Sequence, residues 1–243
     1  MEVKKALLIT GSQKPAGGTS ASLSGFLMKR LVVYGVTTRS LDAMRCIDGG
    51  KNSGGQMHIE LLNAVKRADM IIPIFPLYCD TVPYCITRVF EIIHAQYVGR
   101  VGRAAGGARR SKRLMAIVNS GFPESSQCDT AVRVCRRFSK EAGLEFWGAL
   151  KFGGGAMLGD TPLEEVGSWA MSIMRSLDLA AESIAFGDPL PYEATALAAR
   201  LAVPKWGYVT MGNLGMTIEA AKNGALWRIF DRPADGVEGV KIG

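Results

Sequence analysis

A short segment near the start of the chain combines glycines, hydroxyls and a lysine directly after an apolar run. The apolar residues 6–9 lead into residues 11–20. The polar and glycine positions of this segment that could contact an anion are Gly11, Ser12, Lys14, Gly17, Gly18, Thr19 and Ser20. Glycines let the backbone approach an anion closely, and a helix start adds unpaired N–H groups and a partial positive charge. The segment therefore predicts a phosphate-binding loop.

Two familiar phosphate motifs do not fit this loop. The P-loop of nucleotide-binding proteins needs a second glycine five residues after Gly11, where Ala16 stands, and a lysine directly before the Ser or Thr, whereas Gly18 precedes Thr19. The dinucleotide fingerprint needs a glycine at the position of Gln13. The loop therefore indicates a third kind of phosphate pocket, and the alternative is an ordinary strand-to-helix turn with a Ser or Thr cap.

Other catalytic groups are scarce. The chain has only two histidines, His58 and His94, which lie in helical patterns without a partner at metal spacing, and it has no Gly-x-Ser-x-Gly element. Its cysteines are odd in number and show no paired metal spacing: Cys46, Cys79, Cys85, Cys128 and Cys135. We expect no metal site and no catalytic side chain, so a bound cofactor would carry any reaction.

Composition indicates a cytoplasmic globular protein of 243 residues with a formal net charge of +7. No uncharged run reaches the roughly 18 to 20 residues of a membrane span. The apolar residues 6–9 are shorter than a signal-peptide core of about 7 to 15 residues. We therefore expect neither a membrane span nor a leader, and reduced cysteines.

The positive charge is concentrated in residues 99–113. This stretch contains no acid, and its cations are Arg100, Arg103, Arg109, Arg110, Lys112 and Arg113. A solvated loop is the simplest interpretation. Because no aromatic residue is interleaved with these arginines after Tyr97, we expect no nucleic-acid partner.

Apolar patterns predict an α/β protein. Continuous apolar runs predict strands over residues 3–10, 36–41, 69–75, 114–119 and 144–152. Helical spacing predicts helices that begin at Ser20 and that cover residues 57–68, 82–97, 128–142 and 163–186, with a surface loop over 42–55. Five alternating strands and helices indicate a parallel sheet covered on both faces. Loops 11–20, 76–83 and 119–127 would then leave the carboxyl ends of strands, where ligands bind.

The tail from residue 188 onward differs in character. Prolines interrupt it, and short helices are predicted over 194–203 and 216–230. Its large aromatic residues include Trp206, Tyr208 and Trp227. We expect two parts, a domain over 1–187 and an appendage over 188–243 that packs on the domain or on a dimer partner.

Three motifs in this order resemble the NADPH-dependent FMN reductase family. They are Gly11-Ser12-Gln13-Lys14 to Gly18-Thr19-Ser20, then Pro76-Leu77-Tyr78 with Pro83, then Asn119-Ser120-Gly121-Phe122-Pro123-Glu124. The resemblance covers residues 3–159. It implies a flavodoxin-like three-layer sandwich, a five-stranded parallel sheet with helices on both faces, to which the chain adds a helical C-terminal tail.

The resemblance also implies a cofactor site. Residues Ser12, Lys14, Gly18, Thr19 and Ser20 would hold the FMN phosphate. Residues Pro76, Leu77, Tyr78, Asp80 and Thr81 would border the isoalloxazine ring. Residues Asn119, Ser120, Gly121 and Phe122 would run along its polar edge and offer backbone N–H groups to the reduced flavin.

The chain departs from the family pattern at two positions. Relatives with an iron–sulfur cluster carry a compact cysteine group after the second strand, whereas this chain has only Cys46 there, so we expect no cluster. Lys14 stands where arginine is usual, which keeps the charge but loses bidentate phosphate geometry.

The implied function is an FMN-dependent oxidoreductase. It would take hydride from NADPH or NADH and reduce a quinone, a flavin or another small acceptor, as a homodimer. Two alternatives stay open: an electron carrier or flavin-binding protein without nicotinamide turnover, and a flavin-free interaction protein. If the basic segment folds towards the site, Arg109, Arg110 and Arg113 would favour NADPH.

Overall fold

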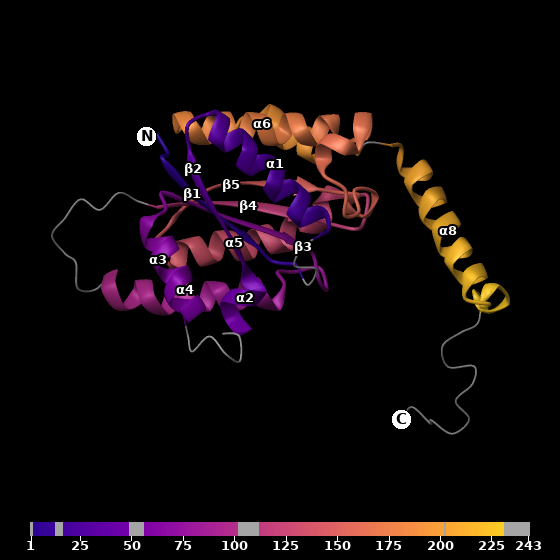
Figure 1. Cartoon of the computed structure of the whole chain (residues 1–243), viewed down its shortest axis with the longest axis horizontal. Helices are drawn as coiled ribbons and strands as arrows, with labels where there is room; N and C mark the ends of the chain where they lie inside the picture. Colours follow the sequence, from indigo (N-terminus) through magenta and orange to yellow (C-terminus); the bar gives the residue numbers. More distant parts are fainter. Residues whose placement is uncertain (1, 13–16, 49–55, 102–111, 202, 231–243) are drawn as a thin grey trace, which may run out of the picture. The chain divides into compact units, whose positions relative to one another are not determined.

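Five parallel strands form one sheet in a computed structural model that describes residues 2–12, 17–48, 56–101, 112–201 and 203–230. The strands are β1 (Lys5–Thr10), β2 (Thr37–Asp42), β3 (Met70–Pro76), β4 (Arg113–Asn119) and β5 (Glu145–Phe152). Their order in the sheet is β2-β1-β3-β4-β5 (Figure 1). This order confirms the predicted five-stranded parallel sheet.

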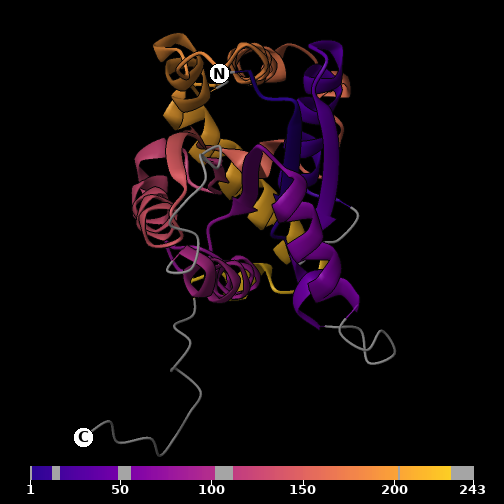
Figure 2. The same ribbon diagram turned by 90° about the vertical axis from the view of Figure 1, so that its left-hand side faces the viewer.

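Helices cover both faces of the sheet (Figure 2). One face packs against α1 (Thr19–Val33), α6 (Met171–Phe186) and α7 (Tyr192–Ala199). The other face packs against α2 (Ala43–Asp48), α3 (Gln56–Arg67), α4 (Tyr84–Val101) and α5 (Asp129–Glu141). The predicted three-layer sandwich is therefore present.

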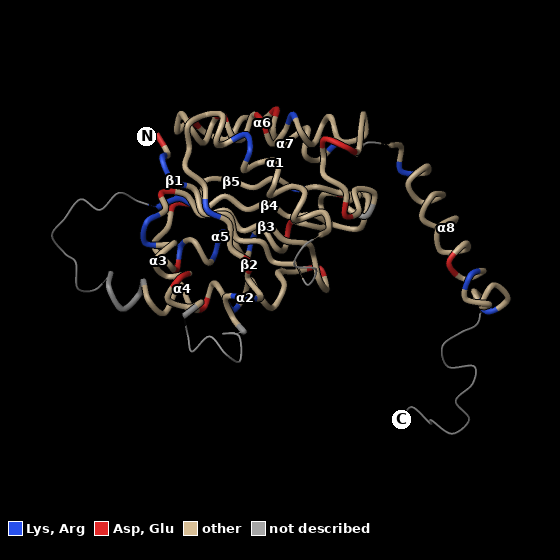
Figure 3. The backbone as a smooth tube through the Cα atoms, viewed as in Figure 1, with Lys and Arg blue, Asp and Glu red and all other residues tan. Residues whose placement is uncertain are grey.

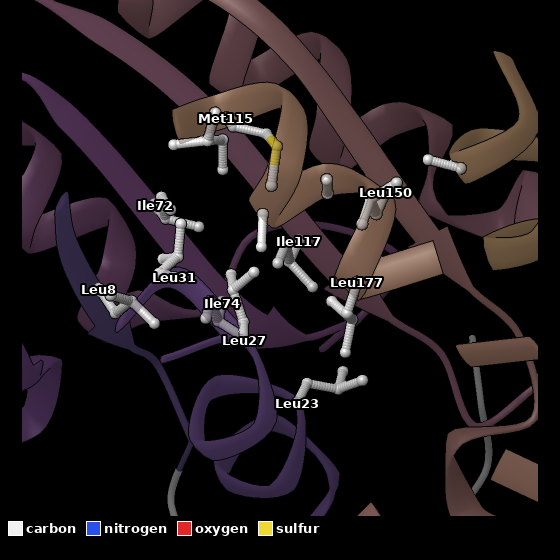
Figure 4. Packing of buried hydrophobic residues seen from close by; sticks show 14 of the residues in the cluster. Leu8, Leu23, Leu27, Leu31, Ile72, Ile74, Met115, Ile117, Leu150 and Leu177 are labelled. Carbon is white, nitrogen blue, oxygen red and sulfur yellow. The ribbon is translucent and has the colours of Figure 1, made fainter. Parts of the chain in front are cut away.

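Both faces of the strands are buried, which explains their unbroken apolar sequences. Leu8 and Ile72 belong to the core under α1 and α6, which also contains Leu27 of α1 and Leu177 of α6 (Figure 4). Leu7, the neighbour of Leu8, belongs to the core on the opposite face.

The structure corrects two predicted elements. The single helix expected over 163–186 consists of 3₁₀ turns at Leu163–Glu165 and Gly167–Ala170 followed by α6. Gly167 has φ +80°, which a right-handed helix cannot continue through. The loop expected over 42–55 contains α2, and its residues 49–55 lie outside the described residues.

The chain divides into two compact units, residues 1–202 and 203–243. Residues 188–201, which the sequence assigned to the appendage, contribute α7 to the first unit. Ala194 and Ala198 of α7 are buried, and the hydroxyl of Ser176 donates a 2.7 Å hydrogen bond to the Ala194 carbonyl. The helix predicted over 194–203 corresponds to α7, which begins and ends earlier than predicted.

The second unit contains α8 (Lys205–Lys222) and a 3₁₀ turn at Leu226–Arg228, where the sequence predicted one helix over 216–230. Every residue of α8 is at least partly exposed. Its charges lie near its two ends and its middle is uncharged (Figure 3). Within the described residues, no helix is both long and apolar enough to cross a membrane.

Candidate functional site

The three loops singled out by the sequence leave the same edge of the sheet. Parallel register pairs Thr10 with Ile74 and Pro76 with Asn119. Asn119 is in turn paired with Phe152 at the end of β5. The loops after β1, β3, β4 and β5 therefore begin side by side at the carboxyl edge of the sheet.

The first loop begins and ends with glycines that the structure requires. The Gly11 N–H donates a 2.9 Å hydrogen bond to the Ile74 carbonyl, and a Cβ atom on Gly11 would lie 2.2 Å from Cγ1 of Ile86. Gly18 has φ 89° and immediately precedes α1. Among the described residues no side chain caps this helix start, and its first turn has no acid. In the described part of the chain this helix start therefore has no Ser or Thr cap, while the phosphate-binding role of the loop stays a prediction.

The hydroxyls of the first loop connect it to other loops. Thr19 Oγ1 donates a 2.6 Å hydrogen bond to the Gly155 carbonyl. Ser20 Oγ donates a 2.8 Å hydrogen bond to Oδ1 of Asn119, and both of these side chains are buried. Ser12 is half-buried, and Lys14 lies outside the described residues.

The second loop is a tight turn closed by a two-residue bridge. Tyr78 and Thr81 exchange backbone hydrogen bonds of 3.3 Å and 3.1 Å. Between them, Cys79 and Asp80 have φ angles of 48° and 55°, which are uncommon for residues other than glycine. The turn leaves Tyr78 40% exposed, while Pro76 and Leu77 are half-buried. The Leu77 N–H donates to the Asn119 carbonyl at 2.9 Å and so joins the second and third loops.

The third loop combines buried polar groups with an exposed ring. Ser120 is 1% exposed, whereas Phe122 is 58% exposed. The Ser120 N–H donates to the Phe152 carbonyl at 2.8 Å, and the Phe122 N–H donates to the Ser120 hydroxyl at 3.0 Å. These two N–H groups, expected to face a ligand, are therefore already used within the protein. Gly121 between them is exposed.

Asn119 contributes a buried donor to the site. The side chain is 5% exposed, and its Oδ1 accepts the hydrogen bond from Ser20. Within the described residues its Nδ2 has no hydrogen-bond acceptor. Buried donors are almost always paired, so this amide fits a polar group of a bound ligand.

Sequence reasoning missed a fourth loop, residues 153–160, which follows β5. The N–H groups of Gly154 and Gly155 donate 2.8 Å hydrogen bonds to the carbonyls of Phe122 and Ser120. A Cβ atom on Gly153 would lie 2.2 Å from the Pro123 carbonyl oxygen. The signal in the sequence was the run of three glycines directly after a predicted strand.

Thiol chemistry is restricted to one position. Cys46, Cys85, Cys128 and Cys135 are buried, whereas Cys79 is exposed in the turn of the second loop. Burial raises the pKa of Cys128 to about 12 and that of Cys46 to about 11. In the described part of the chain no three His, Cys, Asp or Glu residues form a group that could hold a metal ion.

The fold resembles solved flavoproteins at low sequence identity. The FMN-dependent NADH-azoreductase of Bacillus anthracis str. Ames Ancestor, solved in complex with FMN, is 13% identical with a TM-score of 0.51, over 75% of this chain and 100% of that chain. The chain has a flavodoxin-like fold. Two further similar structures are an azoreductase of Bacillus anthracis str. Sterne and the NAD(P)H:quinone oxidoreductase of Methanothermobacter marburgensis.

Both of these structures are 16% identical to this chain. The azoreductase has a TM-score of 0.48, and the match covers 74% of this chain and 99% of the azoreductase. The quinone oxidoreductase has a TM-score of 0.49, and the match covers 76% of this chain and 96% of the quinone oxidoreductase. No protein-family model matches the sequence, and no curated protein matches it. At 13% identity, the likeness to the FMN-bound azoreductase supports the fold alone.

Proposed function

We propose that this protein is an FMN-dependent NAD(P)H oxidoreductase that reduces a small acceptor such as a quinone or a flavin. One observation carries the proposal: an uncapped helix start preceded by glycines lies beside loops with exposed aromatic rings. These features meet at the carboxyl edge of a flavodoxin-like sheet, where this class of fold binds its ligands. The similar azoreductase, which was solved with FMN, supports the same reaction class.

The phosphate of FMN would bind at the start of α1. Gly18 leaves the first turn of the helix without a side-chain cap, so its positive end suits an anion. Ser12, Lys14, Thr19 and Ser20 complete the proposed phosphate subsite. Since the hydroxyl proton of Ser20 is donated to Asn119 and that of Thr19 to the Gly155 carbonyl, both residues would act mainly by holding the loop in place.

The flavin ring would lie between the second and third loops. Tyr78 and Phe122 offer exposed aromatic faces for apolar contact. The other proposed ring contacts are Pro76, Leu77, Asp80, Thr81, Asn119, Ser120 and Gly121. Among these, the Nδ2 group of Asn119 is the donor best suited to a polar edge of the ring.

The protein would bind and orient the reactants rather than supply a catalytic acid. Bound FMN supplies the redox chemistry, by accepting hydride and passing the electrons to the acceptor. The backbone hydrogen bonds among the third and fourth loops fix the wall of the site before any ligand arrives. The exposed rings of Tyr78 and Phe122 would exclude water on ligand binding.

The second unit would complete the assembly. Trp206 and Trp227 are 75% and 90% exposed in the single chain. Large aromatic surfaces are normally buried, so we propose that this unit covers the first unit or a second copy in a homodimer.

Flavin titration and steady-state kinetics test the proposal. Purified protein should bind FMN and should oxidise NADH or NADPH in the presence of a quinone or free FMN. Ser12→Ala should bind FMN at least about tenfold more weakly, because a hydroxyl bond to a charged group is worth roughly 1.5 to 3 kcal/mol. Thr19→Ala should act through the position of the loop, because the Thr19 hydroxyl donates to the Gly155 carbonyl. FMN binding without oxidation of either nicotinamide would favour an electron carrier. Absence of FMN binding would refute both flavin functions.

A further inference from the structure

A pocket lies between the fourth loop, the segment that leads into α6, and the end of α7. Leu158 and Ile173 give it an apolar lining and are at most 7% exposed, whereas Trp169 and Arg200 line it from exposed positions. Small-molecule sites typically combine such an apolar lining with a few polar or charged groups. The pocket is therefore a candidate ligand site in the first unit.

This pocket is a neighbour of the proposed ring subsite. Gly153 and Gly154 of the fourth loop line the pocket. The Gly154 N–H donates a 2.8 Å hydrogen bond to the carbonyl of Phe122, the third-loop residue whose ring we assign to the flavin. A ligand that extends across the fourth loop would therefore contact both places.

Arg200 contributes a positive charge to the pocket. It is exposed and comes directly after the end of α7. Within the described residues its guanidinium forms no ion pair and no hydrogen bond. Guanidinium groups match the geometry of phosphates and can bind them through two parallel hydrogen bonds. Arg200 therefore suits an anionic group of a ligand, and a phosphate in particular.

Trp169 contributes an aromatic surface. It lies in the 3₁₀ turn Gly167–Ala170 and is 42% exposed. Nucleic-acid bases stack on aromatic side chains, and this contact contributes to affinity whatever the base, because every base has a flat π-face. The pocket therefore combines one group that suits a base with one that suits a phosphate.

We infer that this pocket binds the adenosine diphosphate part of NADH or NADPH, with the adenine against Trp169 and a phosphate on Arg200. The inference rests on the proposed function, which requires such a reductant. A nicotinamide dinucleotide has its reactive ring at one end and its adenine at the other, with two phosphates between them. When the nicotinamide lies on the flavin, the rest of the molecule must lie on a neighbouring surface. The pocket beyond the fourth loop is such a surface, and its charge and aromatic ring complement this part of the ligand.

Binding of ADP to the purified protein tests the inference without any turnover. Isothermal titration gives the dissociation constants of ADP and, separately, of FMN for the unaltered protein, Arg200→Gln and Trp169→Ala, with ADP titrated at low and high salt. Arg133→Gln is the control for charge, because Arg133 is an exposed arginine of α5, on the opposite face of the sheet. Tyr192→Ala is the control for aromatic surface, because Tyr192 is 86% exposed at the start of α7, whereas Arg200 follows its end.

The expected result is specific to the adenosine diphosphate. Arg200→Gln and Trp169→Ala should each weaken ADP binding about tenfold, and the effect of Arg200→Gln should be smaller at high salt. Both controls should leave the affinity for ADP unchanged, and every folded variant should bind FMN as the unaltered protein does. In steady-state kinetics, the two pocket variants should raise the KM for the nicotinamide and leave kcat unchanged, because they remove binding far from the reacting ring.

Thermal unfolding verifies the fold of each variant, and Arg200→Gln, at an exposed position, keeps the test decisive if Trp169→Ala is unstable. A protein that binds FMN and oxidises NADH or NADPH, but does not bind ADP at millimolar concentration, would overturn the inference and leave the proposed function intact. ADP binding that Arg200→Gln leaves unchanged at low salt would also overturn it. ADP binding that depends on Arg200 in a protein that binds no FMN would support the pocket and refute the flavin function.

Discussion

The Ser20 hydroxyl donates a 2.8 Å hydrogen bond to Oδ1 of Asn119, and it joins the first turn of α1 to the last residue of β4. Both side chains are at most 5% exposed. A hydrogen bond between buried groups is costly to break, because each group loses its partner without gaining water. This pair therefore fixes the distance between the proposed phosphate and ring subsites.

Ser20→Ala should lower the free energy of unfolding by about 1 to 3 kcal/mol, because it leaves the Asn119 oxygen without its donor. Urea denaturation measures this change. Ser22→Ala is the control, since the Ser22 hydroxyl donates to Thr161 at an exposed position. An equal decrease in the free energy of unfolding in the two variants would show that burial of the Ser20–Asn119 pair does not add to stability.

Gly153→Ala should destabilise the fourth loop strongly. Its new methyl group would lie 2.2 Å from the backbone oxygen of Pro123, and a backbone atom cannot move aside as a flexible side chain can. Overpacking of this kind costs about 1 to 3 kcal/mol or more. Gly121→Ala, in the facing loop, is the control because no atom lies within 4 Å of the added carbon. In thermal unfolding, the midpoint temperature should fall for Gly153→Ala and stay unchanged for Gly121→Ala.

Phe122→Ala should weaken the binding of both FMN and riboflavin by roughly two- to tenfold, the effect expected from one lost aromatic contact. Stability should hardly change, because this ring is 58% exposed. Phe186→Ala removes a ring of similar exposure from the end of α6 and should leave flavin affinity unchanged. If Phe122→Ala binds both flavins as tightly as the unaltered protein, the ring subsite is wrongly placed.

One thiol of five should react quickly with a disulfide reagent in the folded protein. Cys79 is exposed and the other four cysteines are buried. The fast phase should disappear in Cys79→Ser, and all remaining thiols should react after denaturation. A fast phase that survives this substitution would show that a buried cysteine is accessible.

Alkaline pH should destabilise the fold through the buried thiols. Burial raises the pKa of both Cys128 and Cys135 from 9.0 to about 12. Between these values the folded state holds protons that the unfolded state has released, so the free energy of unfolding falls as pH rises above about 9. Urea denaturation from pH 8 to pH 11 should show a smaller fall in Cys128→Ala/Cys135→Ala. An identical pH dependence would exclude these thiols as the cause.

Truncation should separate α7 from the second unit. A chain that ends at residue 201 keeps the buried Ala194 and its hydrogen bond to Ser176, so it should unfold cooperatively. A chain that ends at Gly187 loses α7 and exposes the core beneath it, and it should be less stable or aggregate. Circular dichroism and size-exclusion chromatography compare the two. Equal stability would show that α7 contributes little.

Much of the fold was predictable because buried parallel strands have a distinctive sequence. The apolar run over 69–75 predicted β3, which the structure places at Met70–Pro76. Once strands and helices alternate, the loops after the strands must share one edge, so the meeting of the first three loops followed from topology.

The details of the site were not predictable, since they depend on contacts between distant residues. No local pattern indicates that the Phe122 N–H donates to the Ser120 hydroxyl, which removes one of the donors predicted to face the flavin. The pocket that Trp169 and Arg200 line depends on how the end of α7 returns to the fourth loop. The helical spacing of apolar residues over 163–186 also continues through Gly167, so it did not indicate the break in the helix there. That break follows from the positive φ angle of Gly167.

The strand order has a consequence for how the protein emerges from the ribosome. After β1, β2 and β3 have paired, β4 and then β5 join the same side of the sheet in the order in which they are synthesised. Folding can therefore follow translation without rearranging earlier strands. The glycine loop after β5 is the last of the four loops to be synthesised, so a nascent chain lacks part of the proposed site until about residue 160 has been released.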